Sequence, residues 1–318
     1  MQLAPLPDVS PKTLRAIAVR HGLSVSPGDN AFTRLPDSGI CNGHWLLGDD
    51  HVLRVPRLAP NFARAIRREA LVVPIARNAG VQTPAIVACD EALDLLPVPY
   101  AIYERVRGAS LESLAPEPAT TPRVWRAVGR DLARLHGGIP RTHPLDLLRE
   151  ETPRDIRPLA ARRASEGYFG VAEARWLMGW LERLAPAALA PITLRFCHAD
   201  VQSANVMVAH AQASEAPRYA ALIDWGDAQW RDPAWDCAGM PLRAAPHVLD
   251  GHREVAALDG DETAEARVLW RHLHLALAML ERGPQPARSW AERPLGMLID
   301  VLRFAREVTT ERWKGWLW

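Results

Sequence analysis

The chain contains 318 residues, of which 48% are hydrophobic and 24% are charged. This length and composition allow a large hydrophobic core and one or two domains. The 38 basic residues nearly balance the 37 acidic ones, and the formal net charge is +1. The chain therefore lacks the excess of positive charge that would indicate a nucleic acid or an anionic membrane surface as its main partner.

Lysine is scarce in this sequence. Only Lys12 and Lys314 are lysines, and the other 36 basic residues are arginines. Neither lysine follows a glycine, which excludes a P-loop of the Gly-Lys-Ser/Thr type. A Schiff-base lysine would have to be one of these two residues, which lie near the chain ends. A GC-rich genome is the simplest explanation of the bias.

The cysteines and the N-terminus favour a cytoplasmic protein. The four cysteines are far apart and form no C-x-x-C pair; they are Cys41, Cys89, Cys197 and Cys237. Buried thiols in a reducing compartment are therefore favoured over a disulfide or metal framework. No signal peptide is visible, and no apolar run approaches the roughly 20 residues that cross a bilayer.

The first hundred residues predict a small mixed lobe. A helix is expected from Ser10, with Pro11 in its first turn. A second helix is expected over residues 61–78, and Pro74 is expected to kink it or end it early. Strands are expected at residues 32–35, 44–47, 51–55, 86–89 and 100–103. Antiparallel strands with a helix packed on one face form an α+β lobe.

Beyond Gly108 the hydrophobic residues recur at helical spacing. Four stripes are expected to face the core, and their members are Val124, Val128, Leu132 and Leu135, then Val171, Ala174, Leu177, Met178, Leu181 and Leu184, then Leu269, Leu273, Leu277 and Leu280, and last Leu298, Val301, Leu302 and Ala305. The pattern predicts a mixed lobe over residues 1–104, a linker at 105–108 and a helical lobe over 109–318.

Polar residues of the second lobe follow short apolar segments. His198, Asp200 and Asn205 lie in one loop, and Asp224 follows the next apolar segment, residues 219–223. If these segments pair as strands, Asp200, Asn205 and Asp224 meet at one end of a ribbon. Carboxylate and amide oxygens suit Mg²⁺, and a further carboxylate can accept a proton from an attacking hydroxyl. Phosphoryl transfer requires these groups.

Three motifs carry a resemblance to a known family, and they are His198-x-Asp200-x4-Asn205, Ile223-Asp224-Trp225 and Asp232-Pro233-x2-Asp236. In this order they resemble the aminoglycoside phosphotransferase/choline kinase family, in style most closely its hygromycin-type members. The resemblance implies an α+β, two-lobed protein-kinase-like fold with a small antiparallel-sheet N-lobe and a large, mainly helical C-lobe. It also implies transfer of a nucleotide γ-phosphoryl group to a substrate hydroxyl, with Mg²⁺ and either ATP or GTP.

The resemblance also implies roles for single residues of the second lobe. Asp200 is expected to be the catalytic base, and Asn205 and Asp224 are expected to bind Mg²⁺. His198 and Asp236 are expected to support the loop rather than to take part in the chemistry.

Residues that contact the acceptor are less sharply indicated. Asp232 either contacts the acceptor or caps a helix that begins at Pro233. The acidic residues between positions 250 and 265 include Asp261 and Glu262, which could pair with ammonium groups of an acceptor. A solvated charged face is the favoured interpretation of this acidic run. Four tryptophans, at positions 290, 313, 316 and 318, either stack on an acceptor or dock the terminus.

In the first lobe the resemblance implies a nucleotide site. The loop around Ser38 would cover the phosphates. Arg54 stands where kinases place the strand lysine that contacts the α- and β-phosphates, and Glu69 would be its partner. Arginine is forked and permanently charged, so its placement relative to Glu69 is a departure from the lysine pattern. Arg54→Lys is expected to be tolerated.

The linker is expected to bind the nucleotide base through its backbone. The backbone groups of Glu104 and Val106 would contact the purine edge. The resemblance places Tyr103 at the gatekeeper position of the family, where a bulky ring would narrow the inner adenine pocket and favour GTP.

Other functions remain open at this point. The preferred acceptor is an aminoglycoside-like antibiotic, and choline, homoserine, macrolides and sugar-like metabolites are alternatives. A non-catalytic, nucleotide-binding pseudokinase is a rival of another class, favoured only by the arginine at position 54. An α/β-hydrolase is suggested by His136-Gly137-Gly138 but lacks a G-x-S-x-G motif. A metal hydrolase using His198 and Asp200 lacks a second histidine at ligand spacing.

Overall fold

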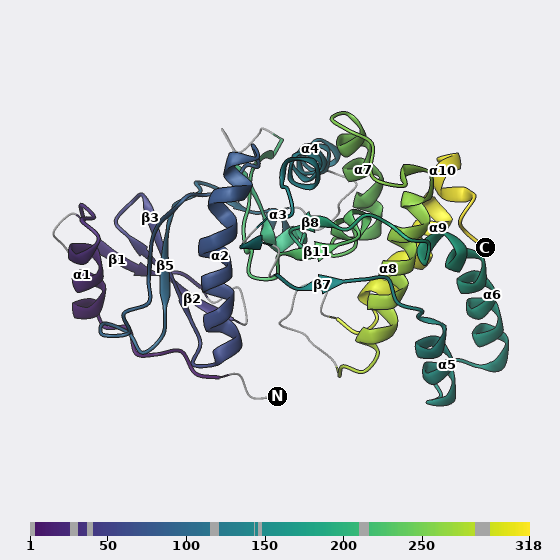
Figure 1. Ribbon diagram of the computed structural model, residues 1–318. Helices are drawn as coiled ribbons and strands as arrows, with labels where there is room; N and C mark the ends of the chain where they lie inside the picture. The colour runs from purple at the N-terminus through teal and green to yellow at the C-terminus, as the bar shows by residue number, and fades with distance from the viewer. Residues whose placement is uncertain are drawn as a thin grey trace. The chain divides into compact units, whose positions relative to one another are not determined.

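The computed structural model describes residues 4–25, 31–36, 41–114, 121–142, 144–145, 148–209, 216–283 and 293–318. Two compact units are present. The N-terminal unit contains the residues up to Arg107 together with Ala221–Ala228, and the C-terminal unit contains Gly108–Ala220 and Gln229–Trp318. Figure 1 shows their helices and strands. The segment 221–228, which the sequence places in the helical lobe, joins the N-terminal unit, where the Leu222 amide donates to the Gln82 carbonyl.

The N-terminal unit is built on a five-stranded antiparallel sheet in the order β1-β2-β3-β5-β4. All five strands were predicted from the sequence, and their bounds are β1 Phe32–Arg34, β2 Asn42–Leu47, β3 His51–Pro56, β4 Ile86–Asp90 and β5 Tyr100–Glu104. Two predicted helices accompany the sheet, α1 Pro11–Arg20 and α2 Pro60–Asn78. As expected, the Ser10 side chain caps α1 by accepting from the Thr13 amide.

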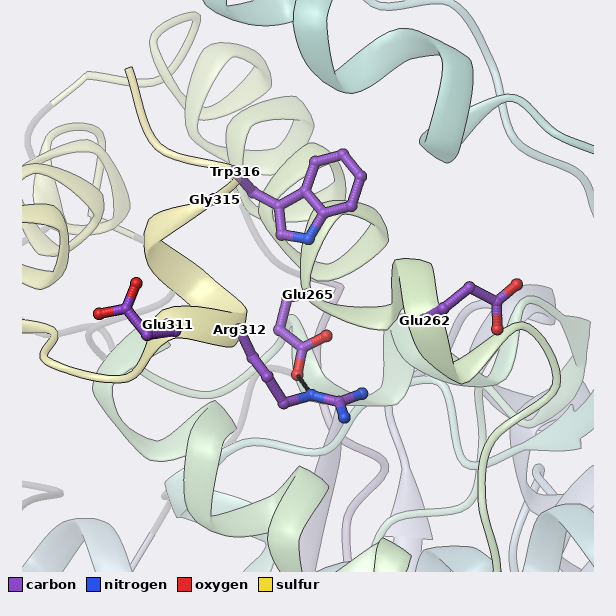
Figure 2. Close-up of a pocket in the computed structure, with 6 residues that line it drawn as sticks. All are labelled: Glu262, Glu265, Glu311, Arg312, Gly315 and Trp316. Carbon is purple, nitrogen blue, oxygen red and sulfur yellow. Dashed lines mark hydrogen bonds and ion pairs between the residues drawn. The ribbon is translucent and has the colours of Figure 1, made fainter.

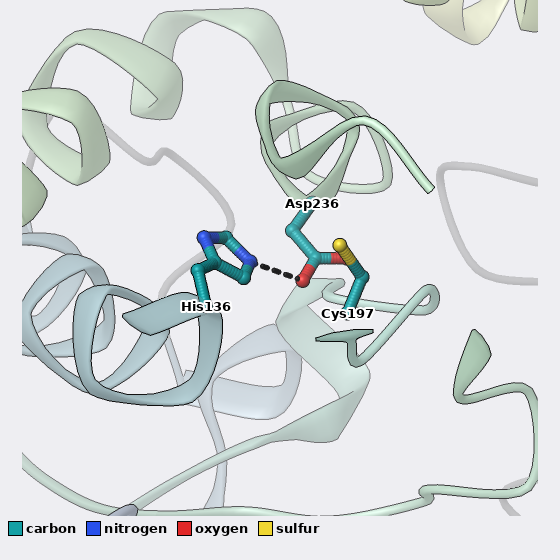
Figure 3. A group of neighbouring side chains, drawn as sticks. All are labelled: His136, Cys197 and Asp236. Atoms are coloured by element: carbon teal, nitrogen blue, oxygen red, sulfur yellow. Dashed lines mark hydrogen bonds and ion pairs between the residues drawn. The ribbon is translucent and has the colours of Figure 1, made fainter. Parts of the chain in front are cut away.

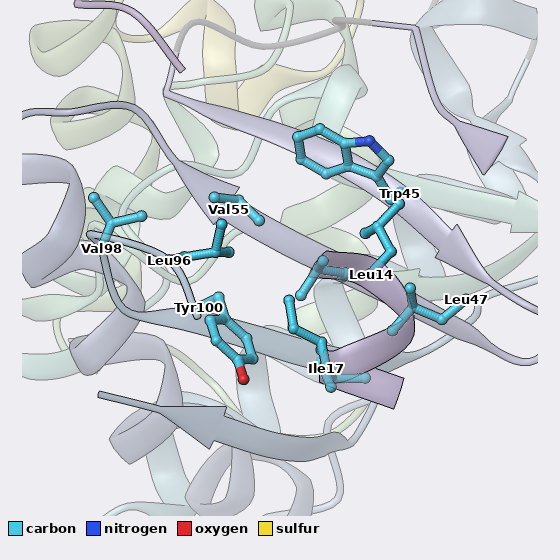
Figure 4. Close-up of a cluster of buried hydrophobic side chains, with 10 residues drawn as sticks. Leu14, Ile17, Trp45, Leu47, Val55, Leu96, Val98 and Tyr100 are labelled. Carbon is cyan, nitrogen blue, oxygen red and sulfur yellow. The ribbon is translucent and has the colours of Figure 1, made fainter. Parts of the chain in front are cut away.

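The two faces of this sheet are covered by different helices. Leu14 and Ile17 of α1 join the apolar core cluster shown in Figure 4, which also contains Leu53 and Val55 of β3. Successive strand residues point to opposite faces. Arg54 therefore faces the other side of the sheet, where its neighbour in the β3–β5 register is Ala101.

Helix α2 packs on that second face and corrects one expectation. Ile66 of α2 forms a small buried cluster with Ala101 and Tyr103 of β5. The helix continues through Pro74 to Asn78 and does not end early. A proline removes one N–H from the helix ladder, and its ring crowds the carbonyl four residues earlier. Burial of the nearby Val73 and Ala76 keeps the turn in place.

The C-terminal unit is mainly helical. Its α-helices are α3 Leu111–Leu114, α4 Pro122–Gly138, α5 Arg157–Ser165, α6 Val171–Ala188, α7 Ala245–Arg253, α8 Ala264–Met279, α9 Gly296–Glu307 and α10 Glu311–Lys314. Short 3₁₀ helices are η4 Ser203–Asn205, η5 Pro233–Cys237, η6 Leu242–Ala244 and η7 Asp261–Thr263. The predicted stripes on α4 and α8 are buried throughout.

Two predicted stripes are only partly correct. On α6 the predicted Val171 is 78% exposed, because it is the first residue of the helix. On α9 the predicted Leu302 is exposed, whereas Met297, Asp300, Val301 and Phe304 are buried. Polar contacts explain which face of α9 is buried. Asp300 accepts from the Leu242 amide at 2.5 Å and from Arg243 Nε at 3.1 Å, and these two bonds hold the face that carries Asp300 inward.

Short strands carry the loop with the predicted polar residues. Strand β8 (Arg195–Cys197) pairs antiparallel with β11 (Gln229–Arg231), which also pairs parallel with β7 (Glu150–Glu151). In a second small sheet, β9 (Val206–Ala209) lies between β6 (Ala109–Ser110) and β10 (Arg218–Leu222). The predicted pairing of the segments on either side of residues 210–215 is thus confirmed.

The C-terminal tryptophans within the described ranges dock the end of the chain. Trp313 is buried and packs edge-on against Phe304, with ring centroids 4.8 Å apart. Trp180 of α6 donates through its indole nitrogen to the Trp316 carbonyl at 2.7 Å, and the Trp318 ring contacts the Trp180 ring. Trp290 lies outside the described residues. No helix within those described ranges is long and apolar enough to cross a membrane.

Helices α4 and α7 cross at unusually close range because each contributes a glycine to the contact. A Cβ added at Gly129 of α4 would lie 2.0 Å from the Val248 carbonyl oxygen of α7. A Cβ added at Gly251 of α7 would lie 2.0 Å from the Arg126 carbonyl oxygen of α4. The two backbones therefore touch directly.

We expect Gly251→Ala to lower the free energy of unfolding by about 1–3 kcal/mol, because the methyl group has to push two helix backbones apart. The matched control is Gly179→Ala in α6, where nothing lies within 4 Å of the added Cβ. That change should be neutral or stabilise by up to about 1 kcal/mol through helix propensity. Denaturant unfolding measures both, and equal effects would contradict the close crossing.

Candidate active site

The loop after β8 fixes Asp200 through two neighbouring amides. The Gln202 side-chain nitrogen lies 3.0 Å from both carboxylate oxygens of Asp200. The Asn205 side-chain nitrogen lies 2.8 Å from Asp200 Oδ2 and 2.9 Å from the Asp200 carbonyl oxygen. Because Asn205 uses its nitrogen in these bonds, its amide oxygen is the atom suited to a cation.

The backbone that precedes Asp200 is held by Asp236. Asp236 accepts from the His198 amide at 2.9 Å and from the Ala199 amide at 2.8 Å. His198 in turn accepts at its Nδ1 from the Asp200 amide at 3.3 Å. Both supporting residues are fully buried. Their place in the loop agrees with a supporting role for each.

Asp236 is an ionised carboxylate despite complete burial. Burial alone would raise its pKa, but the hydrogen bond from His136 and the charge of Arg231 hold that pKa well below its usual range. His136 Nε2 lies 3.0 Å from Asp236 Oδ2, and Arg231 Nη2 lies 3.2 Å from Asp236 Oδ1. The carboxylate therefore acts as a multiple acceptor inside the C-terminal unit.

His136, Cys197 and Asp236 form a buried group whose possible ligand atoms lie within 4.8 Å of one another (Figure 3). The dashed line in Figure 3 is the bond from His136 to Asp236. Burial raises the pKa of the Cys197 thiol well above its ordinary value, which disfavours the thiolate that metals bind. These contacts make the group part of the loop support rather than a metal site.

The backbone is strained next to Asp200 and at Asp224. Ala199, which precedes Asp200, has φ +71°, and Asp224 itself has φ +69°. Non-glycine residues in this left-handed region cost on the order of 1 kcal/mol or more and persist where their surroundings impose them, often at functional sites.

In the N-terminal unit Arg54 joins two carboxylates. Its Nη1 lies 2.8 Å from Glu69 Oε2 on α2, and its Nη2 lies 2.6 Å from Asp224 Oδ1. The predicted pairing of Arg54 with Glu69 is therefore present, although arginine replaces lysine. In the amide orientation that satisfies its hydrogen bonds, Asn42 also accepts from Arg54 Nε at 2.8 Å. Arg54 is 7% exposed, whereas the Asp224 side chain is 40% exposed.

Glu69 is the most strongly desolvated member of this group. Burial raises the pKa of Glu69 to about 7, an effect that the neighbouring Arg54 charge only partly offsets. Its Oε1 is buried without a hydrogen-bond partner within the described part of the chain, which agrees with this cost. The Tyr103 hydroxyl donates to Glu69 Oε2. The predicted gatekeeper ring is thus anchored to α2 by its hydroxyl.

The linker backbone is partly used by the fold itself. The Glu104 amide donates to the Ala85 carbonyl at 2.9 Å, so this N–H is not available to a ligand. The Arg105 amide donates to the Asp50 carbonyl at 2.7 Å. Within the linker, the backbone groups that could still contact a nucleotide base are therefore the Glu104 carbonyl and those of Val106. Ser38 lies outside the described residues.

Asp232 is a structural residue, not an acceptor contact. It is fully buried, its Oδ1 accepts from the Ala234 amide at 2.9 Å at the start of η5, and it pairs with buried Arg267. The predicted capping alternative is therefore the correct one, because a side chain without exposed surface cannot contact a ligand.

The acidic run between residues 250 and 265 is neutralised by arginines rather than simply solvated. Five of its carboxylates form ion pairs, which are Asp250–Arg126, Glu254–Arg130, Asp259–Arg195, Asp261–Arg253 and Glu265–Arg253. Arg312 adds bonds to Asp261 at 2.8 Å and to Glu265 at 3.0 Å. Glu262 is exposed and lines a hollow with Glu265, Arg312 and Trp316 (Figure 2).

Several residues of this arrangement were not predicted. Gln202 lies inside the loop motif but was given no role. Its position two residues after Asp200 is the sequence feature that could have indicated their contact. Asn42 carries no sequence signal, because its partner Arg54 lies on another strand, and the contact of Arg231 with Asp236 of η5 was not predicted either. His136 enters the sequence analysis only as part of the His136-Gly137-Gly138 motif, whereas its ring contacts Asp236, which lies 100 residues away.

A sequence model of the phosphotransferase enzyme family, APH, matches residues 33–252, well over half of the chain. Among curated proteins no match is found. The chain is similar to several solved structures. The GDP complex of wild-type aminoglycoside 2'-phosphotransferase-IIIa is 17% identical, with a TM-score of 0.59 over 90% of this chain and 96% of that chain.

Two further structures are similar at comparable levels. The GDP and kanamycin complex of APH(2")-IIia is 18% identical, with a TM-score of 0.57 over 92% of this chain and 99% of that chain. Spectinomycin phosphotransferase, APH(9)-Ia, in complex with ADP and spectinomycin, is 10% identical, with a TM-score of 0.57 over 96% of both chains. At these identities the likeness shows the kinase-like α+β fold, as predicted from the motifs.

The family match agrees with this fold. A nucleotide and a hydroxyl-bearing small molecule are accordingly its partners. The chain therefore belongs to the phosphotransferase enzyme family and is an enzyme that transfers phosphate from a nucleotide to a hydroxyl of a small molecule.

Proposed function

We propose that this enzyme transfers the γ-phosphoryl group of ATP or GTP to a hydroxyl of an aminoglycoside-like antibiotic, as a resistance-type phosphotransferase of the cytoplasm. The observation that carries the kinase chemistry is the fixed position of Asp200 between Gln202 and Asn205. The choice of acceptor is supported by similar structures whose names include kanamycin and spectinomycin.

Asp200 is the catalytic base in this proposal. Its side-chain partners named above include the amide nitrogens of Gln202 and Asn205, which donate to the carboxylate and fix its orientation. The carboxylate aims the acceptor hydroxyl and takes its proton as the phosphoryl group is transferred. Asp236 keeps this loop in place through the two amides that precede Asp200.

Mg²⁺ is proposed to bind through Asn205 and Asp224. Both residues offer the hard oxygen atoms that Mg²⁺ prefers, and Asn205 already directs its nitrogen toward Asp200. When bound, the ion would neutralise negative charge on the nucleotide phosphates. Asp224 also accepts from Arg54, so its carboxylate is held in one orientation by a charged partner.

Arg54 is proposed to contact the nucleotide phosphates, with Glu69 setting the direction of its side chain. A guanidinium is planar and carries five N–H groups, so Arg54 can hold the carboxylates of Glu69 and Asp224 and still present an N–H group to a phosphate oxygen. The carbonyl of Glu104 and the backbone of Val106 are proposed to bind the base. Ser38 is proposed to lie over the phosphates.

A metabolite acceptor of the same family is the second candidate, and one observation favours it. Five carboxylates of the acidic run are paired with arginines, so Glu262 is the exposed carboxylate of this run that remains for a cationic acceptor. Choline, homoserine, macrolides and sugar-like compounds should therefore be screened beside aminoglycosides, with ATP and GTP in the presence of Mg²⁺. A nucleotide-binding pseudokinase would phosphorylate none of them.

We expect Asp200→Asn to reduce kcat by about 10²–10⁴-fold, because the general base is lost. Nucleotide affinity, measured by titration calorimetry, should change less than about threefold, since the substitution leaves the nucleotide contacts in place. The exposed-surface control is Asp155→Asn, which removes a carboxylate that pairs with Arg157. Transfer at the wild-type rate by Asp200→Asn would show that Asp200 is not the base.

Loss of Arg54 should affect both stability and nucleotide use. Arg54→Ala leaves two carboxylates without their shared cation, a change that costs about 3–5 kcal/mol for a buried pair, and it should raise the nucleotide KM at least tenfold. Arg54→Lys keeps the charge on a single nitrogen and should be tolerated, with a nucleotide KM much closer to that of the wild type than to that of Arg54→Ala. Arg67→Ala breaks an exposed pair between α2 and Glu91, which follows β4, and should be almost silent. A normal nucleotide KM in Arg54→Ala would refute this placement.

Nucleotide preference depends on the ring of Tyr103 in this proposal. Tyr103→Met removes the bulk and should shift the ratio of kcat/KM values from GTP toward ATP. Tyr103→Phe keeps the ring and removes only the hydrogen bond to Glu69, so it should leave that ratio unchanged. Steady-state kinetics with both nucleotides distinguish the two effects. An unchanged ratio in Tyr103→Met would exclude Tyr103 as the determinant.

A further inference from the structure

Two buried histidines connect helices α4 and α7 to the loop that carries Asp200. His136 Nε2 on α4 lies 3.0 Å from Asp236 Oδ2, and His136 Nδ1 lies 3.2 Å from His252 Nε2 on α7. His252 Nδ1 lies 2.8 Å from the Ala256 carbonyl oxygen. Both rings are 4% exposed. The proposed mechanism gives His252 no role, and His136 has appeared so far only as a partner of Asp236.

The partners decide which ring nitrogens carry protons. The Asp236 carboxylate already accepts from two backbone amides and from Arg231, so His136 Nε2 must donate to it. The Ala256 carbonyl can only accept, so His252 Nδ1 must also donate. In two neutral rings, His136 Nδ1 and His252 Nε2 would then both be bare acceptors facing each other at 3.2 Å. A hydrogen bond between them needs one additional proton.

We propose that His136 and His252 share one additional proton, and that this proton makes them positioning residues for the catalytic loop. The shared proton completes a chain from the Ala256 carbonyl through His252 and His136 to Asp236. Asp236 then holds the amides of His198 and Ala199, directly before Asp200. The inference rests on the proposed role of Asp200 for its effect on catalysis, but the protonation itself does not.

The additional proton lies between His136, which contacts Asp236, and His252, which contacts the Ala256 carbonyl. Burial and the neighbouring His136 lower the pKa of His252 to about 4, which leaves His252 as the acceptor. An imidazolium at His136 lies beside the ionised Asp236, so the buried cation and the buried anion compensate each other.

Other charged groups face this pair from the surrounding elements. They are Asp236 on η5, Arg231 on β11, Arg253 on α7, Asp259 in the segment before η7 and Asp261 on η7. Arg231 and Arg253 oppose a positive charge at the pair, whereas the three carboxylates favour it. Asp236 is the carboxylate in direct contact with His136, so its charge dominates.

Removal of the shared proton has a structural consequence. Two nitrogen lone pairs would then face each other, and the rings could relieve this only by rotating or by moving α4 away from α7. Rotation of His136 would weaken its bond to Asp236, and with it the support of the Asp200 loop. Loop positioning is therefore expected to weaken on the alkaline side as the proton is lost.

The first test is a ¹⁵N NMR measurement of the full chain with labelled histidine at neutral pH. We expect one ring with both nitrogens protonated, which His136→Gln abolishes, and a partner ring with a single protonated nitrogen, which His252→Gln abolishes. His247→Gln on α7 is the matched control and should leave both signals unchanged. Two singly protonated rings in the wild type would overturn the proposal, whatever the activity of the enzyme.

The second test is the pH dependence of kcat. The wild type should lose at least about threefold in kcat over the pH range in which NMR shows loss of the shared proton. In His252→Gln a side-chain amide can donate to neutral His136, so this loss should disappear while the acceptor KM stays the same. An unchanged alkaline loss in His252→Gln would refute the positioning role. If Asp200→Asn remained active instead, the proposed base would fail while the NMR result still stood.

Discussion

The loop that carries Asp200 depends on one buried carboxylate, Asp236. Its two oxygens accept from the His198 and Ala199 amides, from Arg231 and from His136. Burial of an isolated charge costs several kcal/mol, and this set of donors, two of them on cationic or histidine side chains, offsets that cost. Because Ala199 adopts φ +71°, the turn before Asp200 would relax without these bonds. The position of the proposed base is therefore a consequence of the electrostatics of a residue 36 positions later in the chain.

The N-terminal unit contains a similar buried charged group, but there the central side chain is a cation and not an anion. Here one buried cation, Arg54, holds the carboxylates of Glu69 and Asp224. The alternation of β3 places Arg54 on the face that α2 covers, while Leu53 and Val55 fill the core on the other face. A chain with two lysines uses the guanidinium fork at this position, and the fork reaches two acceptors at once. The raised pKa of Glu69 indicates that desolvation is the main cost of this arrangement.

Local patterns predicted most of the fold, and long-range polar contacts account for what they missed. The strands, the stripe on α4 and the cap at Asp232 follow from periodicity and from nearest neighbours, which a sequence displays directly. The buried face of α9 depends on bonds from Asp300 to Leu242 and to the adjacent Arg243, about 60 residues earlier. The pairing of the acidic run depends on arginines from several helices and strands. No single segment contains such information, and the same reason hides the role of His136.

The short distance between His136 and His252 has its origin in backbone contact. Gly129 and Gly251 allow α4 and α7 to approach until a Cβ at Gly129 would lie 2.9 Å from the His252 amide nitrogen. At that separation the two rings lie with centroids 5.3 Å apart and nitrogens in hydrogen-bond range. Larger residues at the crossing would move the helices apart and remove the need for a shared proton. The two glycines thereby couple a feature of helix packing to the protonation of a histidine that contacts Asp236, and through Asp236 to the loop that carries Asp200.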